Sequence, residues 1–474
     1  MFAIATAIKA MALTRRPPAK QDILRAFMSA LAAALRGVEG AGTMVLVDVL
    51  EEHLDEAEFR WLQWEKALGA PDFSLMEVAR LEELLLAHLD GLVVGASSSV
   101  ESVLRPAFAT EDAFRICAAA FSLLALGEVD EVLLRLREAE PEARAAIRRA
   151  LELSEAPGLG ARLLDVLRRE DTAPQAEVLE ALAFRQEAPP EVLAHFFTHG
   201  EQRARVAALR AALPLPEDAA RGLLPSLLDS AHPSVRAAAM GAGLASGVRS
   251  AWETCRTAVR ARDAHSLEAM VLLAMGGSET DISLLLGLLD AEQLRPHALW
   301  ALGFSGRVAA MEACVAYLEV PVVAQLAGEA FSAMTGLRLE APYALLPGER
   351  PEGAPPPPEL QEDLDADLVP RPEDDLPWPN VATVRGWWDA EKKRFAKGTR
   401  YLLGRPFNGS VLVEALETSP MRRRHVLARE LALRSQGTLM VRTRAFTHVQ
   451  RAEQAKARAA SARIHTRSFD SGLR

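Results

Sequence analysis

Histidine and carboxylate side chains are the groups in this sequence that could bind a metal ion or transfer a proton, and they occur together in two short triplets. His53-Leu54-Asp55 and His88-Leu89-Asp90 stand 35 residues apart. A site shared by two packed helices would use His53 with Glu52 or Glu56, and His88 with Asp90. Its chemistry would be metal binding or acid–base catalysis.

The surroundings of both histidines favour a structural role instead. Each lies on or beside an apolar helix face, in consecutive helices that we expect to pack antiparallel. The positions near His88 that could supply further ligands hold leucines (Leu84, Leu85 and Leu92). We therefore expect each histidine to hydrogen-bond a backbone or carboxylate group across the helix pair.

A second histidine pair, His195 and His199, has the i, i+4 spacing of zinc ligands on a helix. Glu191 and Glu201 are near in sequence, but no nearby residue is an obvious third ligand, and Gly200 is expected to end the helix. The sequence also lacks a phosphate-binding GxxxxGK[ST] loop, a GxGxxG turn after a strand, a GxSxG elbow and an HExxH helix. We therefore assign no catalytic, cofactor-binding or metal-binding residue.

The composition predicts an all-α fold. Half of the 474 residues are hydrophobic, yet only 5% are aromatic, so Ala, Leu and Val must form the core. β-branched and aromatic residues are too sparse for a large sheet.

Charge is distributed unevenly along the chain. The net charge is −10, but residues 421–474 hold 13 Lys and Arg against three acids (13 − 3 = +10), which leaves −20 on the residues before them. An acidic body makes a nucleic-acid-binding surface unlikely on electrostatic grounds. A basic end segment is compatible with self-association, an acidic partner or a solvated terminus.

The cysteines and the hydropathy indicate a cytoplasmic protein. Cys117, Cys255 and Cys314 are widely spaced in Ala-rich helical settings, which favours buried, reduced thiols. The first residues lack the charge order of a signal peptide, and no run of apolar residues is long enough for membrane insertion. We expect residues 1–18 to be a disordered start.

An internal repeat runs through the middle of the chain. Eight related segments begin at Arg115, Arg144, Glu177, Arg205, Arg236, Glu268, Pro296 and Gln325. Their third and seventh positions are all apolar and share one helix face. Leu-rich second helices lie between them, such as VDEVLLRLREA and ETDISLLLGLLD. A period near 30 with two helices per unit predicts an α-solenoid of about eight short HEAT-like repeats over residues 109–340.

Two segments carry the resemblance to HEAT repeats. LLDSAHPSVRAAAMGAGL resembles a HEAT junction, in which Pro233 opens a helix, and HALWALGFSG resembles the HEAT-like repeats of the phycobilin-lyase type. HEAT-like solenoids can host lyase or DNA glycosylase activity, so the resemblance leaves an enzyme possible.

An N-terminal helical block, residues 19–108, precedes the repeats. Helical spacing predicts helices at about 19–36, 43–69 and 74–94, and Ser74 with Glu77 predicts a capping box at the start of the third.

The N-terminal block resembles an uncharacterised proteobacterial HEAT-repeat family. The matching residues are His53, Glu56, Ala57, Phe59 and Trp61 in the first motif, and Ala87, His88, Leu89, Asp90, Gly91 and Leu92 in the second. Arg60 and Glu82-Glu83 depart from the family pattern. Genes of this family often lie beside type VI secretion genes, which implies an adaptor role. No activity is established for this family. The resemblance therefore implies that the two His-Leu-Asp triplets mark a helical module and not a reaction centre.

Three segments follow the repeats. Residues 341–380 hold eleven Pro and ten acids, which predicts an extended acidic linker. Residues 381–436 form a helical subdomain, whose W-W…F-x-x-G-x-R-Y-L-x-G pattern also resembles the family. Its candidate partner-binding residues are Trp387, Trp388, Arg394, Arg400 and Tyr401, although the Trp pair more simply docks the subdomain onto the last repeat. Residues 437–474 form a basic tail, for which a frayed solvated helix is favoured over nucleic-acid contact or docking.

The sequence thus predicts a non-catalytic scaffold or adaptor that holds a protein partner, a secretion component or effector, on a HEAT-like solenoid, without a cofactor. The alternative is a solenoid-based enzyme or metal-binding protein that uses His53 with His88, or His195 with His199.

Overall fold

The computed structural model describes residues 47–168, 174–346, 348–354 and 373–473. The predicted start at 1–18, the helix at 19–36 and the centre of the linker lie outside these residues. The described chain is almost entirely helical, which confirms the all-α solenoid prediction. Its one sheet is a short hairpin of β1 (Tyr401–Leu402) and β2 (Arg405–Pro406), antiparallel with Tyr401 opposite Pro406.

The chain forms two compact units, which are described separately. Unit 1 comprises residues up to Trp64, then Leu81–Arg162 and Asp171–Pro174; unit 2 comprises Glu65–Arg80, Leu163–Glu170 and Gln175–Arg474.

Unit 1 contains most of α3 (Val47–Ala67) and α4 (Leu75–Val94). The helical stripe of α3 is buried, with Leu54, Ala57, Trp61 and Trp64 fully inaccessible. The Trp61 ring meets Phe121 of α7 (Ala113–Leu126) edge to face at 5.8 Å. After α4 the chain continues through α5 (Ala96–Ser99), the π-helix η1 (Val100–Leu104) and α6 (Arg105–Ala107). The large aromatic side chains therefore anchor the N-terminal block onto the first repeat helix.

The capping box predicted before α4 lies in unit 2 and has the expected geometry. The Ser74 backbone N–H donates to Glu77 Oε2 at 2.8 Å, and the Glu77 N–H donates to Ser74 Oγ at 3.4 Å. The Ser74 hydroxyl also donates to Glu77 Oε2 at 2.7 Å, and this bond together with that of the Ser74 backbone N–H lowers the pKa of Glu77. The two exchanged bonds satisfy backbone donors that the first helical turn leaves unpaired.

The helices of the repeats are grouped here by their order within each repeat, the first helices as the first row and the second helices as the second row. The first row is α7, α9 (Pro141–Leu153), α11 (Gln175–Arg185), α13 (Gln202–Ala211), α16 (Pro233–Ala245), α18 (Leu267–Gly276), α20 (Arg295–Leu302) and α22 (Ala324–Thr335). The second row is α8 (Val129–Glu138), α10 (Leu159–Leu167), α12 (Pro190–Phe196), α14 (Glu217–Gly222) with α15 (Leu224–Leu228), α17 (Arg249–Arg260), α19 (Glu279–Leu286) and α21 (Val308–Tyr317).

Small residues let the first-row helices, here called the inner helices, stack closely. In unit 2, each inner helix from α11 to α22 packs on the next, and in unit 1 α7 packs on α9. All eight third-position residues of the repeat are buried: Cys117, Ala146, Leu179, Ala207, Ala238, Met270, Ala298 and Ala327. Pro233 is the first residue of α16, where its missing N–H costs no hydrogen bond.

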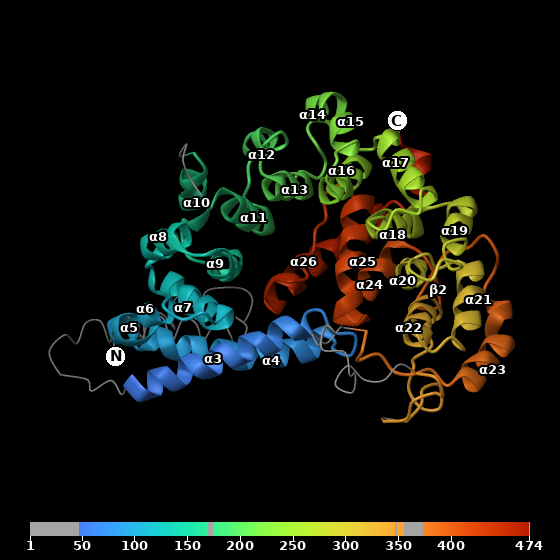
Figure 1. Cartoon of the computed structure of the whole chain (residues 1–474), viewed down its shortest axis with the longest axis horizontal. Helices are drawn as coiled ribbons and strands as arrows, with labels where there is room; N and C mark the ends of the chain where they lie inside the picture. Colours follow the sequence, from blue (N-terminus) through green and yellow to red (C-terminus); the bar gives the residue numbers. More distant parts are fainter. Residues whose placement is uncertain (1–46, 169–173, 347, 355–372, 474) are drawn as a thin grey trace. The chain divides into compact units, whose positions relative to one another are not determined.

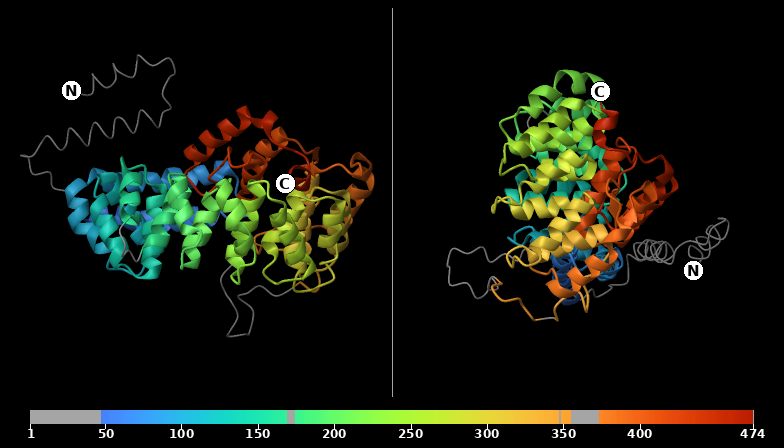
Figure 2. Two further views of the ribbon diagram at one scale, coloured as in Figure 1. Left: turned by 90° about the horizontal axis from the view of Figure 1, so that it is seen from above. Right: turned by 90° about the vertical axis from the view of Figure 1, so that its right-hand side faces the viewer.

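The segments after the repeats pack into the same core as the repeats of unit 2. They are α23 (Val381–Glu391), η3 (Lys392–Arg394), the hairpin, α24 (Gly409–Thr418), α25 (Met421–Arg434), α26 (Thr447–Ala459), η4 (Ser461–Arg463) and η5 (Phe469–Gly472). Figure 1 shows α24 and α25 beside the inner helices α16 to α22, and both views of Figure 2 show these red helices along one side of the green and yellow repeats. Gly437 (φ 77°), just after α25, passes so close to the end of α13 that a Cβ would lie 1.6 Å from the Leu213 oxygen.

The tail differs from the solvated helix that its sequence favours. Gln450 in α26 is fully buried: its amide donates to the Ala445 carbonyl at 2.7 Å, and its oxygen accepts from Arg424 at 2.7 Å. The inward face of α26 is therefore largely polar. A polar buried face lacks the apolar periodicity by which a packed helix is recognised in a sequence.

No single helix among the described residues is long and apolar enough to cross a membrane. α4 and the helical stretch Ala96–Ala107 would reach the necessary length and composition together, but a bend of 103° separates them.

Candidate functional site

The inner helices of unit 2 are bound at their C-terminal ends by arginines from the segments after the repeats. Arg434 donates to the Met275 carbonyl near the end of α18 at 2.7 Å, and Arg423 donates to the Gly303 carbonyl just after α20 at 2.9 Å. The last turn of a helix leaves carbonyls unpaired and carries partial negative charge. A guanidinium group satisfies both the hydrogen-bonding and the electrostatic need.

A buried cluster of three charges connects these contacts. Glu430 of α25 is fully buried; it accepts from Arg434 Nε at 2.6 Å and from Arg400 Nη2 at 2.9 Å. Burial alone would raise the pKa of Glu430, but the two arginines outweigh burial and hold that pKa below its ordinary value. Burial lowers the pKa of Arg434 to about 10. Both guanidinium groups also lie over the Phe407 ring, at 3.9 and 4.8 Å.

A pocket of about 430 Å³ opens between the inner helices α13, α16 and α18 and helix α25. Its walls are mostly Ala, Leu and Val, and its charged residues include Arg210, Glu268 and Arg429. Arg429 pairs with Glu268 and crosses Gly241 so closely that a Cβ there would lie 2.8 Å from its Nη2. Burial and, to a lesser extent, the neighbouring charge of Arg210 lower the pKa of Arg429 to about 10. Among the described residues no carboxylate pairs with Arg210, so these three charges sum to +1.

His425 lies at one edge of this pocket and is held neutral. Its Nε2 lies 2.8 Å from the Leu68 carbonyl, which can only accept, so Nε2 carries the proton. Nδ1 then accepts from the Thr443 hydroxyl at 2.7 Å. Burial lowers the pKa of His425 to about 4. The imidazole thus joins α25 to the end of α3 within unit 2.

The structure brings His53 and His88 together in unit 1. Their Nδ1 atoms lie 3.2 Å apart, so each histidine bonds the other rather than the expected backbone or carboxylate group. Burial and the charge of His53 lower the pKa of His88. Gly91 faces the His53 ring, and a Cβ there would lie 2.7 Å from Nε2. The lack of a side chain at Gly91 thus leaves space for an imidazole.

The other residues singled out in the two N-terminal sequence motifs serve this helix pair differently. Trp61 is fully buried, and Glu56 pairs with Arg60 at 3.2 Å one turn later. Asp90 is exposed on α4. Among the described residues, no group of three or more His, Cys, Asp and Glu side chains is arranged to hold a metal ion.

His195 and His199 do not share a helix as their spacing suggested. Helix α12 ends at Phe196, because the chain turns after it, and both imidazoles flank the Phe196 ring at 5.4 and 5.1 Å. His199 Nδ1 accepts the backbone N–H of Glu201 at 3.2 Å. His195 and His199 therefore do not lie one turn apart on a single helix, as a zinc pair with this spacing would require.

The candidate partner-binding residues of the C-terminal region are mostly internal. Trp388 is 5% exposed, and its ring meets Phe331 of the last repeat edge to face at 5.6 Å; Trp387 meets the same ring at 5.9 Å. Tyr401 is buried and its hydroxyl accepts the Ala396 N–H at 2.8 Å. Arg400 belongs to the buried charge cluster, whereas Arg394 is exposed beside Glu391. The Trp pair thus docks α23 onto α22.

Sequence reasoning missed Arg210, Glu268, His425, Arg429, Glu430 and Arg434. The excess of arginine after residue 421 was visible in the sequence, but it was interpreted as a solvated or partner-binding surface and not as a set of internal contacts. Nothing in a sequence marks a main-chain carbonyl as the partner of an arginine.

Comparison with known proteins leaves the family open. No protein-family profile and no curated protein matches the chain. Among solved structures, the crystal structure of an engineered protein aligns over 81% of this chain and 98% of its own, with 15% identity and a TM-score of 0.29.

Replacing Gly91 by Ala should have opposite effects with and without His53. Alanine is about 1 kcal/mol more favourable than glycine within a helix. In the natural chain the added methyl must displace the His53 ring and break the Nδ1–Nδ1 contact, which offsets this gain. In a His53→Ala background, Gly91→Ala should stabilise the protein. Urea unfolding of the four proteins measures the coupling; equal effects in both backgrounds would contradict the packing.

Replacing His425 by Gln should reduce the loss of stability in acid. The folded pKa of about 4 lies below the ordinary 6.5, so the folded state resists protonation and loses stability as the pH falls from 6.5 towards 4. This interval corresponds to about 3 kcal/mol. The free energy of unfolding of His425→Gln should fall less over that range, whereas exposed His265→Gln should follow the natural protein. Parallel curves for all three would refute the assignment.

Replacing Glu430 by Gln should destabilise unit 2 strongly. Arg400 and Arg434 would lose their common counter-charge in a buried setting, which costs about 3–5 kcal/mol. The matched control is Glu414→Gln, whose half-exposed pair with Arg405 is worth less than about 1 kcal/mol. Chemical denaturation compares the two; similar midpoints would show that the buried cluster is not needed for stability.

Proposed function

We propose that the chain is a non-catalytic scaffold or adaptor that holds a protein partner on the inner helices of its HEAT-like repeat. The observation that carries this proposal is the pocket between α13, α16, α18 and α25, with its surplus arginine. The repeat already binds polypeptide at this face, since α25 lies along it through side-chain contacts to its helices. A second polypeptide could bind through contacts of the same kinds to the part of this face that α25 does not cover.

The pocket indicates the chemistry of the partner. Glu268 pairs with Arg429, so it does not neutralise the positive charge of Arg210. The surrounding Ala, Leu and Val side chains supply apolar walls. A carboxylate side chain next to an aliphatic one would satisfy both. Arginine is well suited to this task because its fork binds a carboxylate through two parallel hydrogen bonds. The partner segment is therefore acidic and apolar.

The cellular setting follows from the N-terminal motifs. Their resemblance to a family encoded beside type VI secretion genes supports a secretion component or effector as the partner, met in the cytoplasm. The alternative function is metal binding or catalysis at His53 and His88, which is favoured only by the contact between their Nδ1 atoms.

The test is capture of a partner by tagged full-length protein from its native cells, with identification by mass spectrometry. We expect a stoichiometric secretion component with the natural protein and its loss, by at least about tenfold, with Arg210→Glu because the charge at the pocket is reversed. The control is Arg221→Glu, which removes another exposed arginine, on the second-row helix α14. Equal recovery with both variants would exclude the pocket. A stoichiometric metal lost with His53→Ala would instead support the alternative.

A further inference from the structure

The last described residues, 464–473, lie against α17, α18 and α25 and include the single 3-10 turn η5 (Phe469–Gly472). We call this stretch the strap. Its central residue is Phe469, whose ring occupies the space where Gly276 has no side chain: a Cβ there would lie 1.9 Å from the ring. The Phe469 ring meets Trp252 edge to face at 6.0 Å, and Arg434 lies over it at 4.8 Å. The surface of the repeat at Gly276 and Trp252 is therefore shaped to accommodate one aromatic ring.

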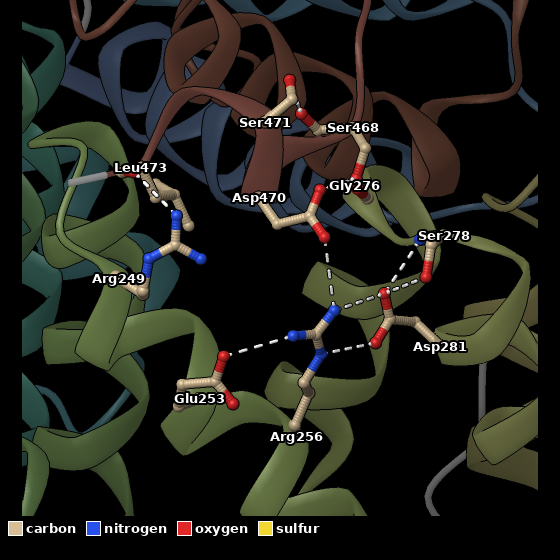
Figure 3. A network of polar contacts seen from close by, with 10 residues as sticks. All are labelled: Arg249, Glu253, Arg256, Gly276, Ser278, Asp281, Ser468, Asp470, Ser471 and Leu473. Atoms are coloured by element: carbon tan, nitrogen blue, oxygen red, sulfur yellow. Dashed lines mark hydrogen bonds and ion pairs between the residues drawn. The ribbon is translucent and has the colours of Figure 1, made fainter.

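Asp470 of the strap meets an arginine that the repeat holds in place (Figure 3). Arg256 of α17 is fixed by Asp281, which accepts from its Nε at 2.7 Å and from its Nη2 at 3.1 Å. Asp281 is in turn fixed by the Ser278 capping box at the start of α19. The same Nη2 reaches Asp470 Oδ2 at 3.4 Å. The guanidinium is thus oriented by groups outside the strap, which lowers the entropy cost of binding a carboxylate.

The backbone of the strap is bound as well. Arg434, 5% exposed, donates to the carbonyls of His465 and Arg467, both at 2.9 Å, and Arg249 donates to the carbonyl of Leu473 at 3.0 Å. The Ser468 hydroxyl donates to the Gly276 carbonyl at 2.7 Å (Figure 3). Contacts to main-chain carbonyls, together with a fitted aromatic ring and one carboxylate contact, are the features of a site that recognises a short peptide segment.

The strap nevertheless remains partly open to water. Ser471 and Gly472 are exposed, and Phe469 and Asp470 are only partly buried. A cavity of about 490 Å³ borders the strap between Leu244, Leu439 and Phe469. A segment with exposed backbone and a hollow beside it opens at lower cost than the buried helices it rests on.

We infer that α17, α18 and α25 form a peptide-recognition site for a Ser-Phe-Asp segment that begins a 3-10 turn, and that the strap is its intramolecular ligand. Phe469 and Asp470 give the site its specificity, and the arginines give it affinity for the backbone. The strap competes with the same segment supplied by another chain and so controls access to the site. This inference does not involve Arg210 and does not depend on the inner-face pocket.

The experiment uses full-length protein and a fluorescent peptide with the sequence of residues 462–474. In a Phe469→Ala/Asp470→Ala protein the strap is weakened, so the peptide should bind saturably. Binding to the natural protein should be at least about tenfold weaker, because a tethered ligand competes at an effective concentration in the mM range. Peptides with Phe469→Ala or Asp470→Asn should each bind the variant at least about tenfold more weakly than the natural peptide.

Two outcomes would overturn the inference. One is the absence of saturable binding to a variant whose circular dichroism and melting match those of the natural protein. The other is equal affinity of the peptide for the two proteins. Hydrogen exchange provides a second measurement on the natural chain: excess peptide should speed exchange at residues 468–473, and unchanged exchange at saturating peptide would contradict displacement.

Discussion

The carbonyl groups at the ends of the inner helices are the constraint on which unit 2 depends. Stacked repeats bring several such ends to one side, and each end carries unpaired acceptors with partial negative charge. Arg423 and Arg434 meet two of them, on α20 and α18. Arg400 reaches the Phe304 carbonyl just beyond α20 at 2.9 Å. The segments after the repeats thus act as a shared cap for α18 and α20.

This arrangement explains the uneven charge of the chain. Within unit 2 the basic end segment packs against acidic residues of the repeats and of α24: Arg429 meets Glu268, and Arg458 meets Glu417. The buried arginines would be costly without such partners. Part of the positive surplus of the last residues is therefore balanced by carboxylates inside unit 2. What remains uncompensated at the inner face is local, at Arg210.

The sequence allowed the repeat to be predicted well because its signal is apolar. Cys117, Ala238 and Ala327 recur at fixed columns, and the structure buries all three. The spacing of Ser74 and Glu77 likewise predicted the hydrogen bonds between them. The polar interior could not be predicted in this way, since Arg434 and Gln450 bond main-chain atoms that every sequence has. His53 and His88 were correctly placed in neighbouring helices, but their direct contact depends on a helix pairing whose register no spacing specifies.

The order in which α25 crosses the inner helices has a consequence for cooperativity. Arg423 binds a carbonyl 120 residues earlier, and Arg434 one 159 residues earlier. A solenoid whose repeats touch only their neighbours unravels repeat by repeat from its ends. Here a helix made after all the repeats ties α18 and α20 to one another through a third element. If one of these repeats unfolds, α25 loses contacts, and α25 is the helix that the other repeats also bind. These repeats should therefore unfold cooperatively.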